Sequence, residues 1–128
     1  MHHITTVLFL FLLAGIAIAH YCALEWYIYW LYPWFDILMH FWGGAVVAVG
    51  ALTPVFSSCT RIRVASLGVA LIIVLSVGIA WEVFEWYFVI VDSHDYLEDT
   101  VLDLSMDLGG GAIGFLLARW LQPKQYIA

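Results

Sequence analysis

The chain has 128 residues, of which 65% are hydrophobic and 11% are charged, and its mean hydropathy is +0.98. Soluble domains are about 45–50% apolar and about 25% charged, so a water-soluble domain is excluded. One bilayer crossing uses roughly 20 apolar residues, so the composition allows about four crossings and leaves no room for a separate soluble domain. The net charge of −6, with only four Lys and Arg residues, argues against nucleic acid as a partner, because phosphate binding needs clustered basic residues.

Four apolar segments are expected to span the membrane, and they predict a single all-α transmembrane domain over residues 1–128, an integral membrane four-helix bundle. The first segment, residues 5–24, contains a sequence that resembles a signal-peptidase site, but no Lys or Arg precedes it, so an uncleaved span is expected. The other spans are expected at residues 36–56, 64–91 and 99–121. The third is longer than a crossing requires, so it is expected to tilt or protrude.

An aromatic stretch with the sequence EWYIYWLYPWF lies between the first two spans, at residues 25–35. Trp and Tyr are enriched at headgroup depth in membranes, so an interfacial aromatic belt is expected here. Its residues are Trp26, Tyr27, Tyr29, Trp30, Tyr32 and Trp34. A docking surface for a partner subunit is the alternative interpretation of the same stretch.

The basic residues all fall on one side of the predicted bundle. Arg61 and Arg63 connect the second and third spans, and Arg119 and Lys124 lie at the end of the fourth. Lys and Arg are retained on the cytoplasmic side, so both termini are expected to be cytoplasmic. The location expected for the chain is a prokaryotic inner membrane. All ten acidic residues are then expected outside the membrane or in its outer half.

Several acids lie inside the predicted spans and recur at helical spacing, which places them on shared helix faces. Asp36 and His40 are four residues apart, Glu82 and Glu85 are three apart, and Asp99, Asp103 and Asp107 step by four. With a rise of about 1.5 Å per residue, five side chains share a layer roughly 6 to 13 Å below the outer helix ends. They are His40, Glu82, Glu85, Asp103 and Asp107.

Buried carboxylates must be protonated, paired with a cation or bound to a metal ion. No Lys or Arg is expected at this depth, and a divalent-metal site is favoured, because one imidazole with several carboxylates suits Mg, Mn, Fe or Zn. The expected ligands are His40, Glu82, Glu85, Asp103 and Asp107. Asp36 and Asp99 are expected around the site or at its entry.

Two other interpretations of this layer stay open. An interhelical clamp of protonated acids would need close helix packing, and glycines do stand below the acids, among them Gly43, Gly44, Gly78, Gly110 and Gly114. A proton or ion relay would need a continuous polar path, and the cytoplasmic halves of the spans, such as residues 46–52 and 69–74, offer none.

The same residues form a pattern that resembles the VanZ-like families and the related YjdF-type inner-membrane proteins. The pattern covers residues 36–121: Asp-x-x-x-His opens the second span, Glu-x-x-acid-or-amide lies in the third, and Asp-x-x-x-Asp-or-Asn with glycines after it lies in the fourth. Ile37, Glu85 and Asp107 stand where VanZ-like proteins tend to have Lys, Gln and Asn, which moves the chain toward the YjdF-type pattern. The resemblance implies a small polytopic membrane protein, with a link to glycopeptide resistance for VanZ-like members and no established activity for the YjdF type.

Two functions are expected from these observations. The first is a metal-dependent hydrolase or transferase that acts on a lipid-linked substrate, with a spare carboxylate as general base. The second is non-enzymatic, either an accessory subunit of a larger membrane complex or an envelope-lipid binding protein, and it is motivated by the aromatic stretch and the small size of the chain. Membrane lipid is a partner in both, and a homo-oligomer stays open.

Overall fold

The computed structural model describes residues 4–60, 64, 66–88 and 96–121. These residues form helices and no strand: α1 (Ile4–Glu25), α2 (Ile28–Leu31), α3 (Trp34–Ala51), α4 (Pro54–Thr60), α5 (Leu67–Tyr87) and α6 (Tyr96–Leu121). Four of the helices, α1, α3, α5 and α6, are long and apolar enough to cross a membrane. The fold is therefore an all-α membrane bundle, which confirms the class expected from composition.

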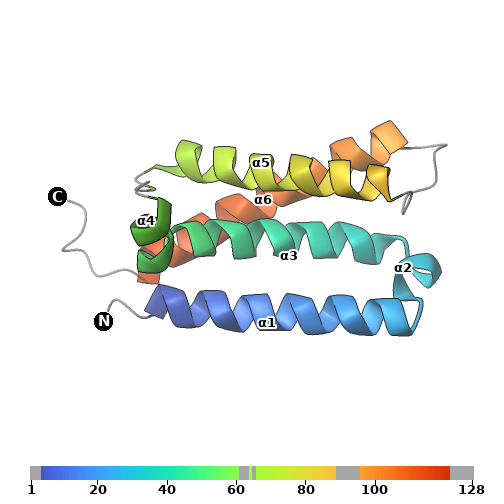
Figure 1. Cartoon of the computed structure of the whole chain (residues 1–128), viewed down its shortest axis with the longest axis horizontal. Helices are drawn as coiled ribbons and strands as arrows, with labels where there is room; N and C mark the ends of the chain where they lie inside the picture. The colour runs from blue at the N-terminus through green and yellow to red at the C-terminus, as the bar shows by residue number, and fades with distance from the viewer. Residues whose placement is uncertain (1–3, 61–63, 65, 89–95, 122–128) are drawn as a thin grey trace.

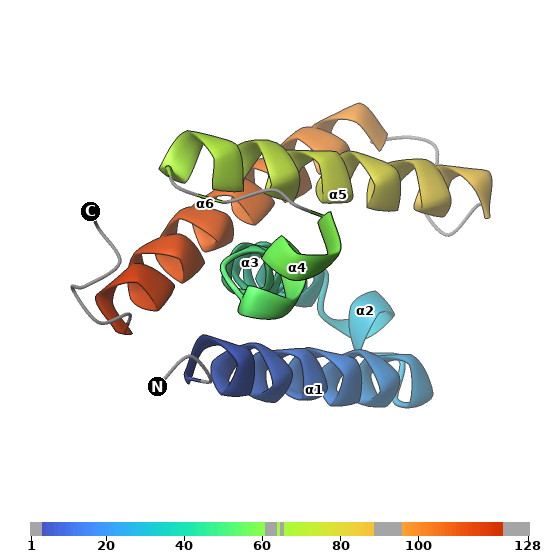
Figure 2. The ribbon, with the colours of Figure 1, turned by 60° about the vertical axis from the view of Figure 1, so that its left-hand side comes forward.

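Helix α3 lies at the centre of the bundle. It contacts α1, α5 and α6, and α5 also contacts α6. Figure 2 shows α3 nearly end-on, with α1 on one side of it and the pair α5 and α6 on the other. In Figure 1 the start of α1, the end of α3, the start of α5 and the end of α6 lie at the left-hand end, where α4 also lies, and α2 lies at the right-hand end.

The helix directions place the described basic and acidic side chains at opposite ends of the bundle. Arg119, which is the one Lys or Arg within the described ranges, lies in the last turn of α6. The described acids lie toward the end that carries α2 (Figure 1): Glu25, Asp36, Glu82, Glu85, Glu98, Asp99, Asp103 and Asp107. Arg61, Arg63, Lys124, Asp92 and Asp95 lie outside the described residues.

Helix α3 ends at Ala51, although the second span was expected to continue to residue 56. The Thr53 hydroxyl explains this early end. It donates a hydrogen bond to the Gly50 carbonyl (2.7 Å) and accepts one from the Phe56 backbone N–H (3.2 Å). The second bond caps a new helix, α4, which begins at Pro54, because proline suits the first position of a helix and cannot continue the preceding one.

The other two spans also differ from their expected bounds. Helix α5 begins at Leu67 rather than at residue 64, after Ser66, whose hydroxyl accepts a hydrogen bond from the first turn. Its expected end at residue 91 lies outside the described residues. Helix α6 begins at Tyr96 rather than at residue 99, and two acids in its first turn favour that start, because negative side chains stabilise a helix N-terminus.

Glycines bring the backbones of α3 and α6 together. A Cβ atom on Gly44 would overlap the backbone carbonyl of Asp107, and one on Gly110 would overlap the backbone carbonyl of Phe41. Further along, a Cβ on Gly114 would lie 2.6 Å from a carbonyl oxygen of α3. The two helices therefore approach each other through a stripe of small residues, as helices do when van der Waals packing drives their association.

Helix α1 is peripheral. Of its 22 residues only Thr5 and Ala23 are buried. Its contact with α3 depends on glycines that accept aromatic rings: a Cβ on Gly15 would lie 2.7 Å from the Trp42 ring, and one on Gly50 would lie 2.7 Å from the Phe9 ring. The compact part of the bundle is thus formed by α3, α5 and α6.

The aromatic stretch forms α2 between α1 and α3. Tyr27, the residue before α2, has a left-handed backbone conformation (φ 54°). Five of the six expected belt residues are exposed: Trp26, Tyr27, Trp30, Tyr32 and Trp34. Tyr29 is the exception. Its hydroxyl lies 2.7 Å from Nδ1 of His20, and the edge of its ring packs against Phe35. The acidic end of the bundle therefore carries an exposed aromatic surface from which Tyr29 turns away.

Candidate metal centre

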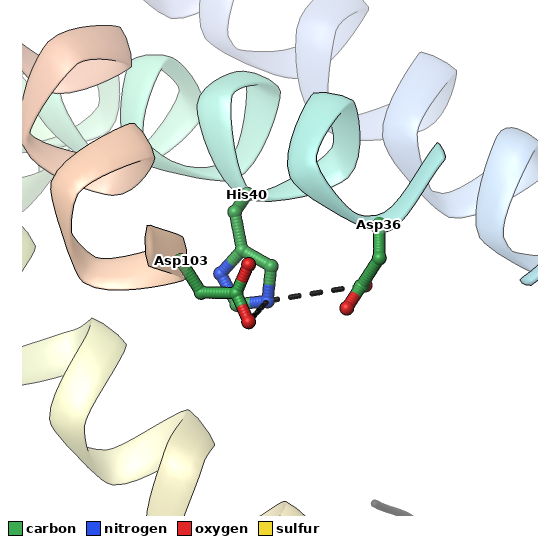
Figure 3. A group of neighbouring side chains, drawn as sticks. All are labelled: Asp36, His40 and Asp103. Atoms are coloured by element: carbon green, nitrogen blue, oxygen red, sulfur yellow. Dashed lines mark ion pairs between the residues drawn. The ribbon is translucent and has the colours of Figure 1, made fainter. Parts of the chain in front are cut away.

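His40 of α3 lies buried in the middle of the acidic side chains. Its Nε2 atom is 3.8 Å from Oδ2 of Asp103 and 3.9 Å from Oδ1 of Asp36. Figure 3 shows both carboxylates beside this ring, Asp36 from one turn earlier on α3 and Asp103 from α6. Two metal–ligand bonds of about 2.1 Å each span at most roughly 4.2 Å, so both separations are compatible with one ion between the nitrogen and the carboxylates.

Asp107 lies on the other side of the imidazole. Its Oδ1 atom is 3.3 Å from Nδ1 of His40. Gly78 of α5 makes room for this carboxylate, since a Cβ at that position would overlap Oδ2. Nδ1 therefore faces Asp107, whereas Nε2 faces Asp36 and Asp103.

Two groups of side chains each bring three donor atoms within 4.8 Å of one another. The outer group consists of Asp36, His40 and Asp103, and the inner group consists of His40, Glu82 and Glu85. All of these residues are buried except Asp36, whose side chain is 33% exposed. Helices α3, α5 and α6 therefore converge on one imidazole.

The expected site residues divide between these groups and their surroundings. His40, Glu82, Glu85 and Asp103, which were expected as ligands, belong to the two groups. Asp36 was expected only around the site, yet it belongs to the outer group. Asp107 and Asp99 are in neither group: Asp107 contacts Nδ1 of His40, and Asp99 is partly exposed in the first turn of α6.

Several buried carboxylate oxygens have no hydrogen-bond partner among the described residues. Asp103 is 1% exposed, and both of its oxygens are unpartnered, as are Oε1 of Glu82 and Oδ2 of Asp107. Burial of unpaired carboxylates is unfavourable, and Arg119, at the opposite end of α6, is too far away to compensate them. An imidazole nitrogen with several unpartnered carboxylate oxygens fits a divalent cation.

Two residues that the sequence analysis did not single out hold Glu82 in place. The Thr100 hydroxyl donates to Oε2 of Glu82 (2.7 Å), and the Tyr96 hydroxyl donates to its backbone carbonyl (3.2 Å). Oε1 is the oxygen that stays unpartnered. Tyr96 and Thr100 continue the helix face of Asp103 and Asp107 at spacings of four and three, and this periodicity could have revealed them.

A second polar pair, His20 and Tyr29, lies near the cluster. The His20 ring also packs edge-on against Trp81 of α5, with 6.3 Å between ring centroids. Burial, together with the nearby carboxylates of Asp36 and Glu85, raises the pKa of Tyr29 to about 12. The phenol therefore stays protonated at neutral pH and remains a hydrogen-bond donor beside the acidic cluster.

The fold and the site together define a small polytopic membrane protein with a histidine–carboxylate cluster buried among three of its helices. The family described as "Predicted membrane protein (DUF2238)" matches residues 1–124, and the chain belongs to that family. This match confirms the membrane protein expected from the sequence, but it does not confirm the VanZ-like or YjdF-type names that the motif suggested. No curated protein and no solved structure matches the chain.

Proposed function

We propose that this protein binds a divalent metal ion among α3, α5 and α6 and uses it as a hydrolase or transferase on a lipid-linked substrate. The observation that carries the proposal is Asp103, which is 1% exposed, has no hydrogen-bond partner on either carboxylate oxygen among the described residues, and lies 3.8 Å from Nε2 of His40. A cation is the partner that this arrangement lacks, because no described Lys or Arg lies at that end of the bundle.

The residues of the cluster take different roles in this proposal. His40 and Asp103, whose Nε2 and Oδ2 atoms lie 3.8 Å apart, offer ligands to an ion of Mg, Mn, Fe or Zn. Glu82 and Glu85 offer further carboxylate oxygens in a second group around the same histidine. Asp107 orients the ring through Nδ1. A bound ion supplies Lewis acidity toward a phosphoryl or carbonyl oxygen and lowers the pKa of a bound water. Asp36, the most exposed carboxylate of the two groups, accepts a proton from an attacking water.

The site is proposed to lie in the outer half of the membrane. Arg119 lies at the opposite end of the bundle from the acids. The sequence predicts the same side of the bundle for Arg61, Arg63 and Lys124. Since basic residues are retained in the cytoplasm, both termini are cytoplasmic and the site lies in the outer half of a prokaryotic inner membrane. The exposed rings around α2 then lie at the outer headgroups, where a lipid substrate would arrive.

Elemental analysis of the purified full-length chain tests the metal centre. About one divalent ion per chain is expected for the wild type, and Asp103→Asn is expected to lose it. Asp99→Asn is the matched control, because Asp99 lies one turn away on α6 and belongs to neither ligand group. Wild-type protein that stays metal-free after growth with Mg, Mn, Fe and Zn would refute the proposal.

The enzymatic part is tested separately. Phospholipid vesicles incubated with the metal-loaded protein are expected to release headgroup or phosphate, detected by thin-layer chromatography of the lipids, and chelation or Asp103→Asn is expected to abolish the release. If the metal-loaded protein is incubated with neutral, anionic and phosphatidic acid vesicles and leaves all of these lipids unchanged, that result would refute the hydrolase or transferase activity but not the metal centre.

A non-enzymatic role is the second candidate, and the exposed aromatic and apolar surface of α1 and α2 favours it. Trp26, Tyr27 and Trp30 are exposed beside a helix that buries only two residues. Such a surface suits an accessory subunit of a larger complex or a lipid-binding protein. Copurification of a stoichiometric partner after mild solubilisation would favour the subunit, and a monodisperse metal-loaded protein without partner would favour the enzyme.

A further inference from the structure

The two ligand groups share His40 but differ in their access to the surroundings. The outer group includes Asp36, whose side chain is 33% exposed, whereas Glu82 and Glu85 of the inner group are 4% and 9% exposed. An ion that arrives from the acidic end therefore meets Asp36 first. Glu82 and Glu85 are both less exposed than Asp36, so a lower dielectric constant strengthens their attraction for a cation.

One imidazole is common to both groups. Nδ1 of His40 lies 3.3 Å from Asp107, which leaves Nε2 as the nitrogen available to a cation. A single lone pair binds one metal ion at a time, so the outer and inner groups are alternative positions for the same ion. Asp103 lies 3.8 Å from Nε2, within coordination distance of an ion on that nitrogen, and it belongs to the outer group alone.

We infer that a divalent cation enters this centre in two steps, with Asp36 as an entry ligand that is exchanged for Glu82 and Glu85 while His40, the residue common to both groups, stays bound. The inference rests on the proposed metal centre and adds the route by which the ion reaches it. In the first step the outer group holds the ion at the exposed edge of the cluster. In the second step the ion moves to the inner group, and the Asp36 carboxylate is released.

An entry ligand and a resident ligand have different kinetic signatures. A residue that binds the ion only during passage lowers the barrier in both directions, so its removal slows loading and release by the same factor and leaves the dissociation constant unchanged. A residue that binds the ion in its final position lowers the energy of the bound state, so its removal accelerates release and raises the dissociation constant. Equilibrium and rate measurements on the same variants therefore separate the two roles.

The test uses the purified full-length chain in lipid nanodiscs and Mn²⁺ as the probe. Loading is followed after rapid mixing through the electron paramagnetic resonance signal of free Mn²⁺, release by an EDTA chase, and the dissociation constant by titration. Asp36→Asn is expected to slow loading and release each about tenfold, with the dissociation constant within twofold of wild type. Glu85→Gln is expected to raise the dissociation constant about tenfold or more, in the range measured for lost metal-site interactions.

Two further variants complete the design. Asp36→Glu keeps a carboxylate and is expected to load within about threefold of the wild-type rate, so a general folding defect at this position would be recognised. Asp99→Asn removes a partly exposed acid from the same end of the bundle without touching either group and is expected to change neither rate. Its unchanged rates would separate loss of the Asp36 ligand from a general loss of surface charge.

The outcomes are distinguishable. If Asp36→Asn raises the dissociation constant tenfold through faster release, Asp36 is a resident ligand and the two-step entry is overturned. Unchanged rates in Asp36→Asn overturn it as well, because the ion would then bypass Asp36. Wild-type protein that binds no Mn²⁺ and carries no other divalent metal removes the proposed function itself, which is a different failure.

Discussion

Asp103 and Asp107 lie one turn apart on α6 and contact opposite nitrogens of the same imidazole. Oδ2 of Asp103 is 3.8 Å from Nε2 of His40, and Oδ1 of Asp107 is 3.3 Å from Nδ1. The two aspartates lie on the same helix face, yet Asp103 faces Nε2, the nitrogen that we propose binds a cation, and Asp107 faces Nδ1. This difference in position gives them different roles.

Asp107→Asn is therefore expected to weaken metal binding by about tenfold. The amide oxygen can still accept a hydrogen bond from Nδ1 of His40, but the negative charge that favours a cation on the ring is lost. Asp103→Asn is expected to reduce binding far more, since it removes a ligand. Titration with Mn²⁺ compares the two variants directly. Equal losses in both would place Asp107 among the ligands and contradict its assignment as an orienting residue.

Thr100→Val is expected to lower metal affinity about tenfold, because valine keeps the shape of the side chain but cannot donate to Oε2 of Glu82. Thr100→Ser restores the hydroxyl and is expected to bind metal as the wild type does. Ser105→Ala is a matched control on the same helix, since that hydroxyl bonds only to an α6 carbonyl on the exposed side. Wild-type affinity in Thr100→Val would show that Glu82 does not need this bond.

Gly44→Ala and Gly110→Ala are each expected to destabilise the protein by about 1–3 kcal/mol, because the added methyl group would overlap a carbonyl of the facing helix. The neighbouring glycines provide controls. A Cβ on Gly43 or Gly109 would have its nearest neighbour at 3.8 Å, an ordinary contact, so Gly43→Ala and Gly109→Ala are expected to be neutral or slightly stabilising. Thermal unfolding in detergent measures all four, and equal effects would argue against close contact of α3 and α6.

Tyr29 is expected to make the stability of the folded protein fall as the pH rises through the alkaline range. Its pKa is raised to about 12 in the folded protein from the usual tyrosine value of 10.0, so between these values the folded state keeps a proton that the unfolded state has lost. The stabilisation is present below pH 10 and is lost as the pH rises toward 12. Stability measured from pH 9 to 12 is expected to fall more steeply in wild type than in Tyr29→Phe, whereas the exposed Tyr87→Phe control is expected to follow wild type.

Cysteine labelling tests the proposed orientation. Cys59 is exposed in α4, at the end of the bundle opposite the acids. In a Cys22→Ser background, an impermeant maleimide is expected to label Cys59 only after the cells are permeabilised. Labelling in intact cells would place that end outside and reverse the topology.

Hydropathy and charge spacing predicted much of the fold. The four spans follow from the length of the apolar runs, and the i, i+4 spacing of Asp36 and His40 brings the two side chains to one site. The break after Ala51 was missed, because hydropathy does not register that Thr53 can cap a second helix at Pro54.

The chemistry of the site was harder to predict than its position. Helical periodicity places Asp103 and Asp107 on one face, but it does not say which nitrogen of His40 each will contact. Nor does a search for charged residues find Thr100, a neutral side chain that orients Glu82. These relationships depend on how the helices are rotated against each other, and single-chain patterns carry no information about that rotation.

The order of the helices along the chain has a consequence for biogenesis. The donor groups come from α3, α5 and α6, and α6 is the last of the four spans to leave the ribosome. Until α6 is inserted, His40 lacks both of its aspartate contacts from that helix, and the acids of α5 stand in the bilayer without Thr100. The nascent chain therefore passes through an intermediate whose histidine and carboxyl groups lack their partners from α6, and assembly of the cluster is coupled to insertion of that helix.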